Sequence, residues 1–298
     1  MSAFHLAGIV PVSGQPLDFK MDWHDCLMPL APDFTAIERA VLECAWAGCE
    51  TIWIVANDDV SPLIRHRLGE WINDPVWLGR HQDPFPSQSR KQIPIFYVPV
   101  RAKDVGKRDC LAWSVLHGAV TAFEISARLS KWVIPRKNYV AFPYGVYDPS
   151  LLRPHRRAIS SEEPFMLSCE GQSIQTGEYL GFTFDKEDFI NCRREIRKGT
   201  GEYTSEVLQD GIYPRNKLPH EERWSARHFS LDKIFQCVII DREKQVEIPH
   251  YYSIDSWDNY CTFLSSDYRK DIVKPPSLIL KYNEWNEIGV DDESKKTN

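Results

Sequence analysis

The chain has 298 residues, of which 43% are hydrophobic and 26% are charged, and its formal net charge is −6. This composition is that of an ordinary globular protein with enough length for a large core. The negative charge argues against a protein built to coat nucleic acid, because phosphate neutralisation needs a basic face. No apolar stretch approaches the roughly 18 residues of a membrane span, and no signal-peptide pattern opens the chain. We therefore expect a cytoplasmic protein without membrane contact.

The eight cysteines are scattered and show neither C-x-x-C nor zinc-ligand spacing. We expect them to be free, buried thiols in a reducing compartment. They are Cys26, Cys44, Cys49, Cys110, Cys169, Cys192, Cys237 and Cys261.

The first sixty residues alternate between strand and helix. Apolar runs at 5–10 and 51–56 predict two strands, and the apolar spacing over 35–47 predicts a helix between them. Thr35 and Glu38 have the spacing of a capping box, and a glycine follows the helix as a natural stop. Strand, loop, helix and strand in this order make a parallel pair.

The alternation continues to about residue 145 and implies an open, mostly parallel central sheet flanked by helices. Ligands of such sheets bind outside the carboxyl ends of the strands, so the loop from Val10 to Pro29 is the first place to look for a site. Further helices are predicted at 61–71 and 109–129, and strands at 93–100 and 139–142. The inner face of the helix at 109–129 is predicted to carry Leu111, Val115, Leu116, Val120 and Phe123.

After Asp148 the pattern predicts a late β-rich elaboration of the same domain. We expect one domain over 1–290 and a polar, disordered tail over 291–298. Helices are predicted at 150–157, 186–198 and 256–264, isolated strands at 165–169 and 179–184, and a pair of strands at 233–240 and 245–250.

Several short passages occur in a fixed order along the chain. A glycine loop follows the first strand, an L-x-P-L passage precedes an I-E-R helix, and an A-G-x-x-x-I-x-I-V passage follows it. A glycine then precedes a long helix, and an I-D-x-x-D passage comes late. Their residues are 7–14, 27–30 with 36–41, 47–55, 106–112 and 252–260. This order resembles the nucleotidyltransferases that activate sugar phosphates, whose GT-A-type fold many glycosyltransferases share.

The resemblance implies two ligand-binding loops. The first follows the first strand and would contact phosphates, since a glycine lets the backbone approach closely. The second precedes the long helix and would flank the base. Their residues are Ser13, Gly14, Gln15 and Lys20 in the first loop and Gly106, Lys107 and Arg108 in the second.

The resemblance also implies Mg²⁺, which prefers carboxylate oxygens. Asp255 is the first candidate ligand and Asp148 the second, and Lys20 and Asp255 are the candidate catalytic residues. Asp255 equally fits the N-cap of the helix predicted at 256–264, and both roles stay open. The passage Asp22–Asp25 places two carboxylates and an imidazole in the first loop, either for metal or base chemistry or as a solvated loop.

The chain departs from the family pattern at three charged positions. The first loop lacks the family's arginine, and Asp25 stands where the family has a lysine. The strand that ends at Phe142 lacks the aspartate that holds the metal. Each change removes a group that stabilises negative phosphate oxygens or positions the metal, and losing one such contact costs on the order of 10²–10³ in rate.

These observations give one leading hypothesis and two alternatives. The first is a nucleotidyltransferase-like protein that binds a nucleotide or nucleotide sugar and, if active, transfers a nucleotidyl group to a sugar phosphate with Mg²⁺. The alternatives are a glycosyltransferase on the same fold and a catalytically degenerate protein used for binding or assembly. Basic runs at 153–157 and 193–198 are either solvated helix faces or contacts for an acidic partner. The base, the sugar and the oligomeric state stay open.

Overall fold

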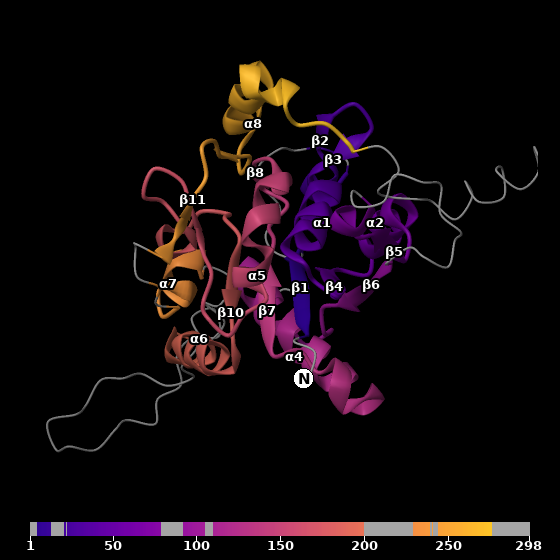
Figure 1. Ribbon diagram of the computed structural model, residues 1–298, viewed down its shortest axis with the longest axis vertical. Coiled ribbons are helices and arrows are strands. Elements are labelled where there is room, and N and C mark those ends of the chain that lie inside the picture. Colours follow the sequence, from indigo (N-terminus) through magenta and orange to yellow (C-terminus); the bar gives the residue numbers. More distant parts are fainter. Residues whose placement is uncertain are drawn as a thin grey trace, which may run out of the picture.

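A mixed six-stranded sheet forms the centre of the molecule. The computed structural model describes residues 5–12, 21, 23–78, 92–104, 110–199, 229–238, 240 and 244–275. The strand order is β10-β7-β1-β4-β6-β5, in which the four inner strands run parallel and both outer strands are antiparallel to their neighbours (Figure 1). The predicted mostly parallel sheet is therefore confirmed. The strands are β1 (Leu6–Pro11), β4 (Thr51–Ala56), β5 (Trp71–Asn73), β6 (Gln92–Pro99), β7 (Lys137–Val140) and β10 (Phe182–Phe184).

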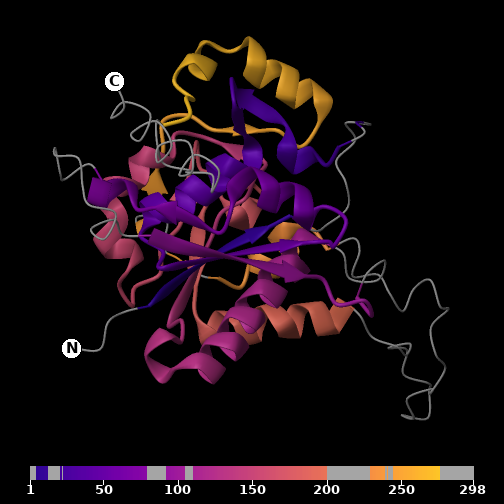
Figure 2. The ribbon, with the colours of Figure 1, turned by 90° about the vertical axis from the view of Figure 1, so that its right-hand side faces the viewer.

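Helices cover both faces of this sheet, as Figure 2 shows with the sheet nearly edge-on. The helices are α1 (Ala36–Ala47), α2 (Ser61–Leu68), α3 (Pro75–Leu78), α4 (Leu111–Leu129), α5 (Arg156–Ile159), α6 (Lys186–Gly199), α7 (Leu231–Phe235) and α8 (Trp257–Ser265). Short 3₁₀ turns are η1 (Asp25–Leu27), η3 (Lys131–Val133), η4 (Pro149–His155), η5 (Ile174–Thr176) and η8 (Asp267–Lys270). Each helix in the described part of the chain is too short or too polar to cross a membrane.

Short two-stranded pairs decorate the central sheet. β2 (Pro29–Ala31) pairs with β3 (Phe34–Thr35), β8 (Gly145–Val146) pairs with β12 (Tyr252–Ser253), and β9 (Leu167–Ser168) pairs with β11 (Val246–Glu247). Of the last four strands, β9 and β11 lie within runs that the sequence predicts as strands, whereas β8 and β12 were not predicted.

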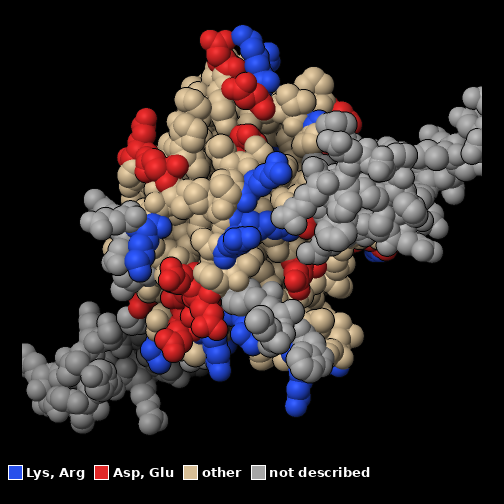
Figure 3. Space-filling view, viewed as in Figure 1, with Lys and Arg blue, Asp and Glu red and all other residues tan. Residues whose placement is uncertain are grey.

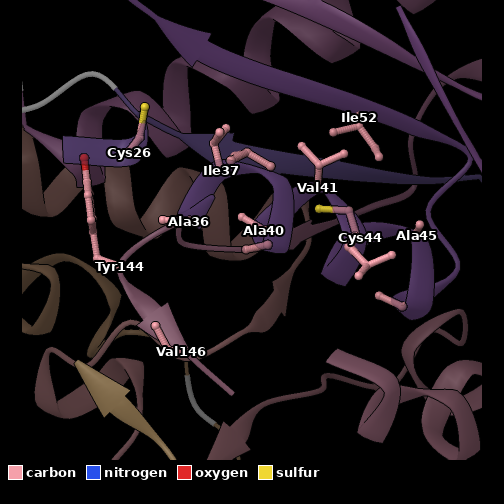
Figure 4. Packing of buried hydrophobic residues seen from close by; sticks show 14 of the residues in the cluster. Cys26, Ala36, Ile37, Ala40, Val41, Cys44, Ala45, Ile52, Tyr144 and Val146 are labelled. Carbon is pink, nitrogen blue, oxygen red and sulfur yellow. The ribbon is translucent and has the colours of Figure 1, made fainter. Parts of the chain in front are cut away.

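Alternating side chains of the inner strands fill two cores. Val10 and Ile54 face the α1 side, whereas Ile9 and Trp53 face α4. This alternation is the strand period of two, and it appears because both faces of a parallel sheet are covered. Figure 4 shows the α1 side, where apolar residues of the helix pack against Ile52 of β4.

Helix α1 has the ends that its sequence predicts. The Thr35 backbone N–H donates to the Glu38 carboxylate at 2.9 Å, which is the capping-box bond. The helix ends at Gly48, whose φ of 94° lies in the left-handed region that glycine adopts without a Cβ penalty. Both local signals are therefore confirmed.

Three predictions about the later elements are wrong. The run predicted as a strand at 233–240 contains α7, because Leu231, Ile234 and Phe235 are spaced to bury one helix face. Its predicted partner at 245–250 contains β11, which pairs with β9 instead. The predicted helix at 61–71 ends at Leu68, and Trp71 begins β5, an edge strand that pairs with β6 and buries Ile72 in the core.

Phe123 is not buried as predicted. Its side chain is 53% exposed, whereas Val115 and Leu116 are buried as predicted. Phe123 follows Leu116 by two helical turns and so lies on nearly the same side of α4, but it belongs to the last part of the helix, where Ile125 and Leu129 are exposed as well.

A buried ion pair joins α1 to the end of β7. The Arg39 guanidinium lies 2.9 Å from the Glu43 carboxylate and donates to the Phe142 carbonyl at 2.6 Å. The Tyr139 hydroxyl donates to Glu43 at 2.7 Å, and Arg39 also lies over the Tyr147 ring, 4.8 Å from its centroid. Burial raises the pKa of Glu43, and the neighbouring Arg39 opposes that shift.

Removing one partner of this pair is expected to destabilise the fold severely. Arg39→Met leaves Glu43 buried without its cation, which costs about 3–5 kcal/mol. Urea unfolding followed by circular dichroism measures the loss. Arg65→Ala, which breaks an exposed pair with Glu70, is the control and costs about 1 kcal/mol or less. Equal midpoints for the two variants would contradict the assignment, and the double variant Arg39→Met/Glu43→Leu should recover much of the loss.

Candidate functional site

The strand order changes direction between β1 and β7. From β1 the chain adds β4 and then β6 on one side, and it returns to place β7 on the other side of β1. In open α/β sheets this switch point leaves a crevice outside the carboxyl ends of the two strands. The segments that leave β1 and β7 are therefore the candidate site.

Most of the predicted ligand-contacting residues belong to two loops that lie outside the described residues. They stay predictions, placed by sequence directly after β1 and directly before α4. They are Ser13, Gly14, Gln15, Lys20 and Asp22 in the first loop and Gly106, Lys107 and Arg108 in the second.

His24 and Asp25 lie beside the carboxyl ends of β1 and β4. His24 precedes η1, and its Nδ1 accepts a hydrogen bond from the Cys26 backbone N–H at 3.2 Å. Asp25 is buried, with 4% of its surface exposed. Burial lowers the pKa of His24, while the charges of Asp25 and Asp59 oppose the shift. Asp59 was not predicted, although its place just after the strand at 51–56 is the signal that would have found it.

Aromatic side chains occupy the end of β7, where the family pattern has an acid. Tyr144 is 2% exposed, and its ring centroid lies 5.7 Å from that of Tyr179. Figure 4 shows the Tyr144 ring reaching from this segment toward η1, which carries Cys26. Burial raises the pKa of Tyr144, and the nearby Cys26 and Asp25 act in the same direction. Tyr144 is therefore a neutral, buried side chain at the end of β7.

Gly145 allows the segment of Tyr179 to lie directly against the segment that contains Tyr144. A Cβ at Gly145 would stand 2.0 Å from the Tyr179 carbonyl oxygen, which no side chain tolerates. The Tyr179 N–H donates to the Tyr251 hydroxyl at 2.9 Å, which further holds this segment in place. The sequence shows Tyr179 only as the start of a predicted strand, because its place depends on contacts far along the chain.

Asp255 lies near the segment that follows β7. The Ile254 N–H donates to the Tyr144 carbonyl at 2.8 Å, which anchors the segment before Asp255. Burial raises the pKa of Tyr179 to about 12, and the Asp255 charge adds to the shift, so the two side chains are neighbours. Asp255 accepts a hydrogen bond from Asn259 Nδ2 at 2.7 Å.

The N-cap of α8 is Ser256 and not Asp255, for which the sequence left this role open. Ser256 Oγ accepts from the Asn259 backbone N–H at 3.3 Å at the start of α8. The same helix is tied to β2, because the Tyr260 hydroxyl donates to the Pro29 carbonyl at 2.7 Å.

Asp148 lies away from Asp255. The register of β8 and β12 puts Asp148 beyond Val146 at one end of the pair and Asp255 beyond Ser253 at the other end. Both Asp148 oxygens accept hydrogen bonds from Ser150, at 2.9 and 2.6 Å, in the cap of η4. The described residues contain no group of three or more His, Cys, Asp or Glu side chains that would hold a metal. The described acids thus do not make a self-contained Mg²⁺ site.

The basic run at 153–157 lies on a different surface. Figure 3 shows its arginines in the middle of the face, over η4 and α5. Arg156 is held by Asp74 through two hydrogen bonds of 2.8 and 2.6 Å. Its side chain packs beside Gly48, at the end of α1 opposite η1. Arg156 is therefore a structural residue, and this run lies apart from the crevice.

Comparison with known proteins identifies the fold. No family model matches the sequence, and no curated protein matches it significantly. A solved protein of Bacillus anthracis, assigned as a glucose-1-phosphate thymidylyltransferase and crystallised with a sucrose, superposes with a TM-score of 0.53 at 10% identity, covering 92% of this chain and 98% of that chain. The chain has a nucleotidyltransferase-like fold.

Two further solved structures are similar at lower scores. A UDP-glucose pyrophosphorylase complexed with UDP-glucose gives a TM-score of 0.45 at 13% identity, with 90% and 100% of the two chains covered. A protein from Mycobacterium tuberculosis H37Rv gives 0.45 at 15% identity, with 89% and 100% covered.

The cap made by His24 is expected to depend on pH. Its pKa is lower in the folded chain than in the unfolded chain, so its contribution to stability is present above about pH 6.5 and is lost as the pH falls through the folded value. Protonation also removes the Nδ1 acceptor from the cap, a contact worth about 1 kcal/mol in other helices. Thermal unfolding of wild type and His24→Asn between pH 7 and pH 5 tests this, because asparagine caps without titrating. Parallel curves for the two proteins would rule it out.

Proposed function

We propose that the protein binds a nucleotide or a nucleotide sugar in the crevice outside the carboxyl ends of β1 and β7. The observation that carries the proposal is the switch point between these strands, in a sheet of nucleotidyltransferase-like fold. The described residues near these strand ends include two polar side chains that are partly exposed, His24 beside Asp25 and Asp255 beside Tyr179. Tyr179 is partly exposed and would offer an aromatic surface, whereas Tyr144 is buried behind it.

The two predicted loops complete this proposed site. Ser13, Gly14 and Gln15 would bring backbone N–H groups to the phosphates, which anions favour at such turns. Gly106, Lys107 and Arg108 would flank the base, just before the N-terminal end of α4. Lys20 would place a cation on the phosphates.

The reaction proposed for this site is nucleotidyl transfer to a sugar phosphate. A phosphate oxygen of the sugar attacks the α-phosphorus of a nucleoside triphosphate, and pyrophosphate leaves. Lys20 would stabilise the negative charge on the phosphate oxygens. Asp255 would hold Mg²⁺ together with the oxygens of the bound phosphates, since Mg²⁺ is commonly held by one or two carboxylates plus substrate phosphates. We assign this role to Asp255 rather than Asp148, because both Asp148 oxygens cap η4.

A second candidate is a nucleotide-binding protein without transferase activity. The specific observation that favours it is the end of β7, where Phe142 and Tyr144 are buried and leave no acid. The second candidate differs from the first in its chemistry and shares its ligand.

Ligand binding and turnover separate the two candidates. In a thermal-shift panel of nucleoside triphosphates and nucleotide sugars with Mg²⁺ or Mn²⁺, a ligand at one hundred times its Kd stabilises by about 2.7 kcal/mol, a shift of roughly 5 °C. Release of pyrophosphate from triphosphate plus sugar phosphate supports the first candidate. Binding without pyrophosphate release supports the second, and a panel with no shift at all rejects the ligand assignment.

Asp255 is expected to carry the metal-dependent part of binding. Asp255→Asn should weaken the Mg²⁺-dependent affinity for the triphosphate by about tenfold or more, because it removes the carboxylate charge. Titration calorimetry with and without Mg²⁺ measures this effect. Asp258→Asn, three residues further on and exposed on α8, is the matched control and should bind like wild type. Equal affinities for the two variants would show that Asp255 does not contact the metal.

A further inference from the structure

Two cysteine side chains meet where α6 packs against α7. Cys192 belongs to α6 and Cys237 follows α7 by two residues, and their sulfur atoms are 3.4 Å apart. The two residues are 45 positions apart in the sequence. Figure 1 shows α6 and α7 next to each other at the lower left of the molecule, far from α8. The pair therefore belongs to neither loop of the proposed nucleotide site.

The surroundings of the pair hold both thiols in place. Cys192 is fully buried in an apolar cluster between α4, α6, α7 and β10, together with Ile196, Ile234 and Phe235. We call this cluster the α6–α7 core. Cys237 donates to the Ile234 carbonyl at 3.2 Å, which fixes its side chain on the α7 side. A disulfide has a sulfur–sulfur distance of about 2.05 Å, so the sulfurs need to approach by little more than an ångström. This is within the reach of small side-chain rotations.

Access to solvent distinguishes the two thiols. Cys237 is partly exposed, whereas Cys192 lies behind it with no exposed surface. The hydrogen bond from Cys192 lowers the pKa of Cys237 and raises that of Cys192, while Asp188 and Glu195 oppose ionisation of Cys237. Cys237 is therefore the thiol that meets an oxidant first.

Another pair of cysteines in the chain provides a contrast. Cys44 and Cys49 are neighbours beneath Gly8, and both are fully buried. An oxidant in solvent reaches neither sulfur of that pair without unfolding. Among the described cysteines that contact one another, only the pair of Cys192 and Cys237 has both close sulfur atoms and access to solvent.

We propose that Cys192 and Cys237 are a redox modification site, at which a reversible disulfide joins α6 to α7. With glutathione disulfide as oxidant, the Cys237 thiolate attacks one glutathione sulfur and releases the other as a thiolate. Cys192 loses its proton and attacks the Cys237 sulfur of this mixed disulfide, which releases the second glutathione. Two protein thiols are oxidised, and one glutathione disulfide is reduced to two glutathiones.

The disulfide would restrict both the unfolded chain and the α6–α7 core. It closes a covalent loop that contains residues 193–236, so the unfolded chain loses conformational freedom. It also fixes α7 to α6, whose buried residues pack with Phe182 of β10. Oxidised protein is therefore expected to unfold at a temperature about 5 °C higher than reduced protein.

Mass spectrometry of the folded, full-length protein tests the site. Wild type is incubated with glutathione disulfide, free thiols are alkylated, and the intact mass and the peptides are measured. The expected product lacks two hydrogens, contains a linked Cys192–Cys237 peptide and returns to the dithiol with dithiothreitol. Cys192→Ser should stop at a mixed disulfide that retains one glutathione on Cys237. Cys261→Ser, which changes a half-buried cysteine on α8, should behave like wild type.

Three outcomes would overturn the proposal. In the first, wild type collects only glutathione adducts and no linked peptide. In the second, the linked peptide joins other cysteines. In the third, Cys192→Ser still loses two hydrogens, which would show that another thiol pairs with Cys237. A change in nucleotide binding is not part of the readout, so this test stands apart from the proposed function.

Discussion

The buried ion pair of Arg39 and Glu43 is the contact on which the arrangement of this sheet depends. It lies between α1 and the end of β7, so it joins a helix that follows β1 to the strand on the other side of β1. Two charges buried away from water are costly, so each bond that the pair makes matters to the fold. These bonds fix the geometry of α1, of the Phe142 carbonyl and of the Tyr139 hydroxyl together. Gly181 belongs to the same constraint, because a Cβ there would stand 2.1 Å from the Tyr139 hydroxyl oxygen.

The ion pair also affects the segment that follows β7 at the switch point. The Phe142 carbonyl is turned toward Arg39, and the chain then buries Tyr144 against Tyr179. The side chains that follow β7 are therefore buried in the core. The polar side chains near this switch point come from other segments, as His24 and Asp255 do. An enzyme on this scaffold would need its phosphate contacts from the loops after β1 and before α4. The buried aromatic residues after β7 and the residues proposed to contact phosphate thus belong to different segments of the chain.

Much of the fold was predictable because its signals are local or periodic. The ends of α1 follow from Thr35, Glu38 and Gly48, and the alternation of strands and helices gives the parallel sheet and the location of the crevice. The strand β5 was not predictable, since three residues form a strand only where β6 offers a partner. The run that contains α7 is apolar enough for either structure, and its packing on α6 selects the helix. Asp255 stays a site prediction made by resemblance, whereas the place of Tyr179 beside Tyr144 and Asp255 depends on long-range contacts that no local pattern encodes.

The hydrogen bond from Tyr260 to Pro29 has a consequence for synthesis of the chain. Its partners are 231 residues apart, and the nearby bond from Ile254 to Tyr144 spans more than a third of the protein as well. A ribosome therefore releases β1, α1 and β4 long before the segment that carries Ile254 and Tyr260 exists. During that interval the bonds to Pro29 and Tyr144 cannot form. The contacts that hold β2 and the end of β7 to α8 and β12 are therefore among the last that the growing chain can make, because they join its early and late segments.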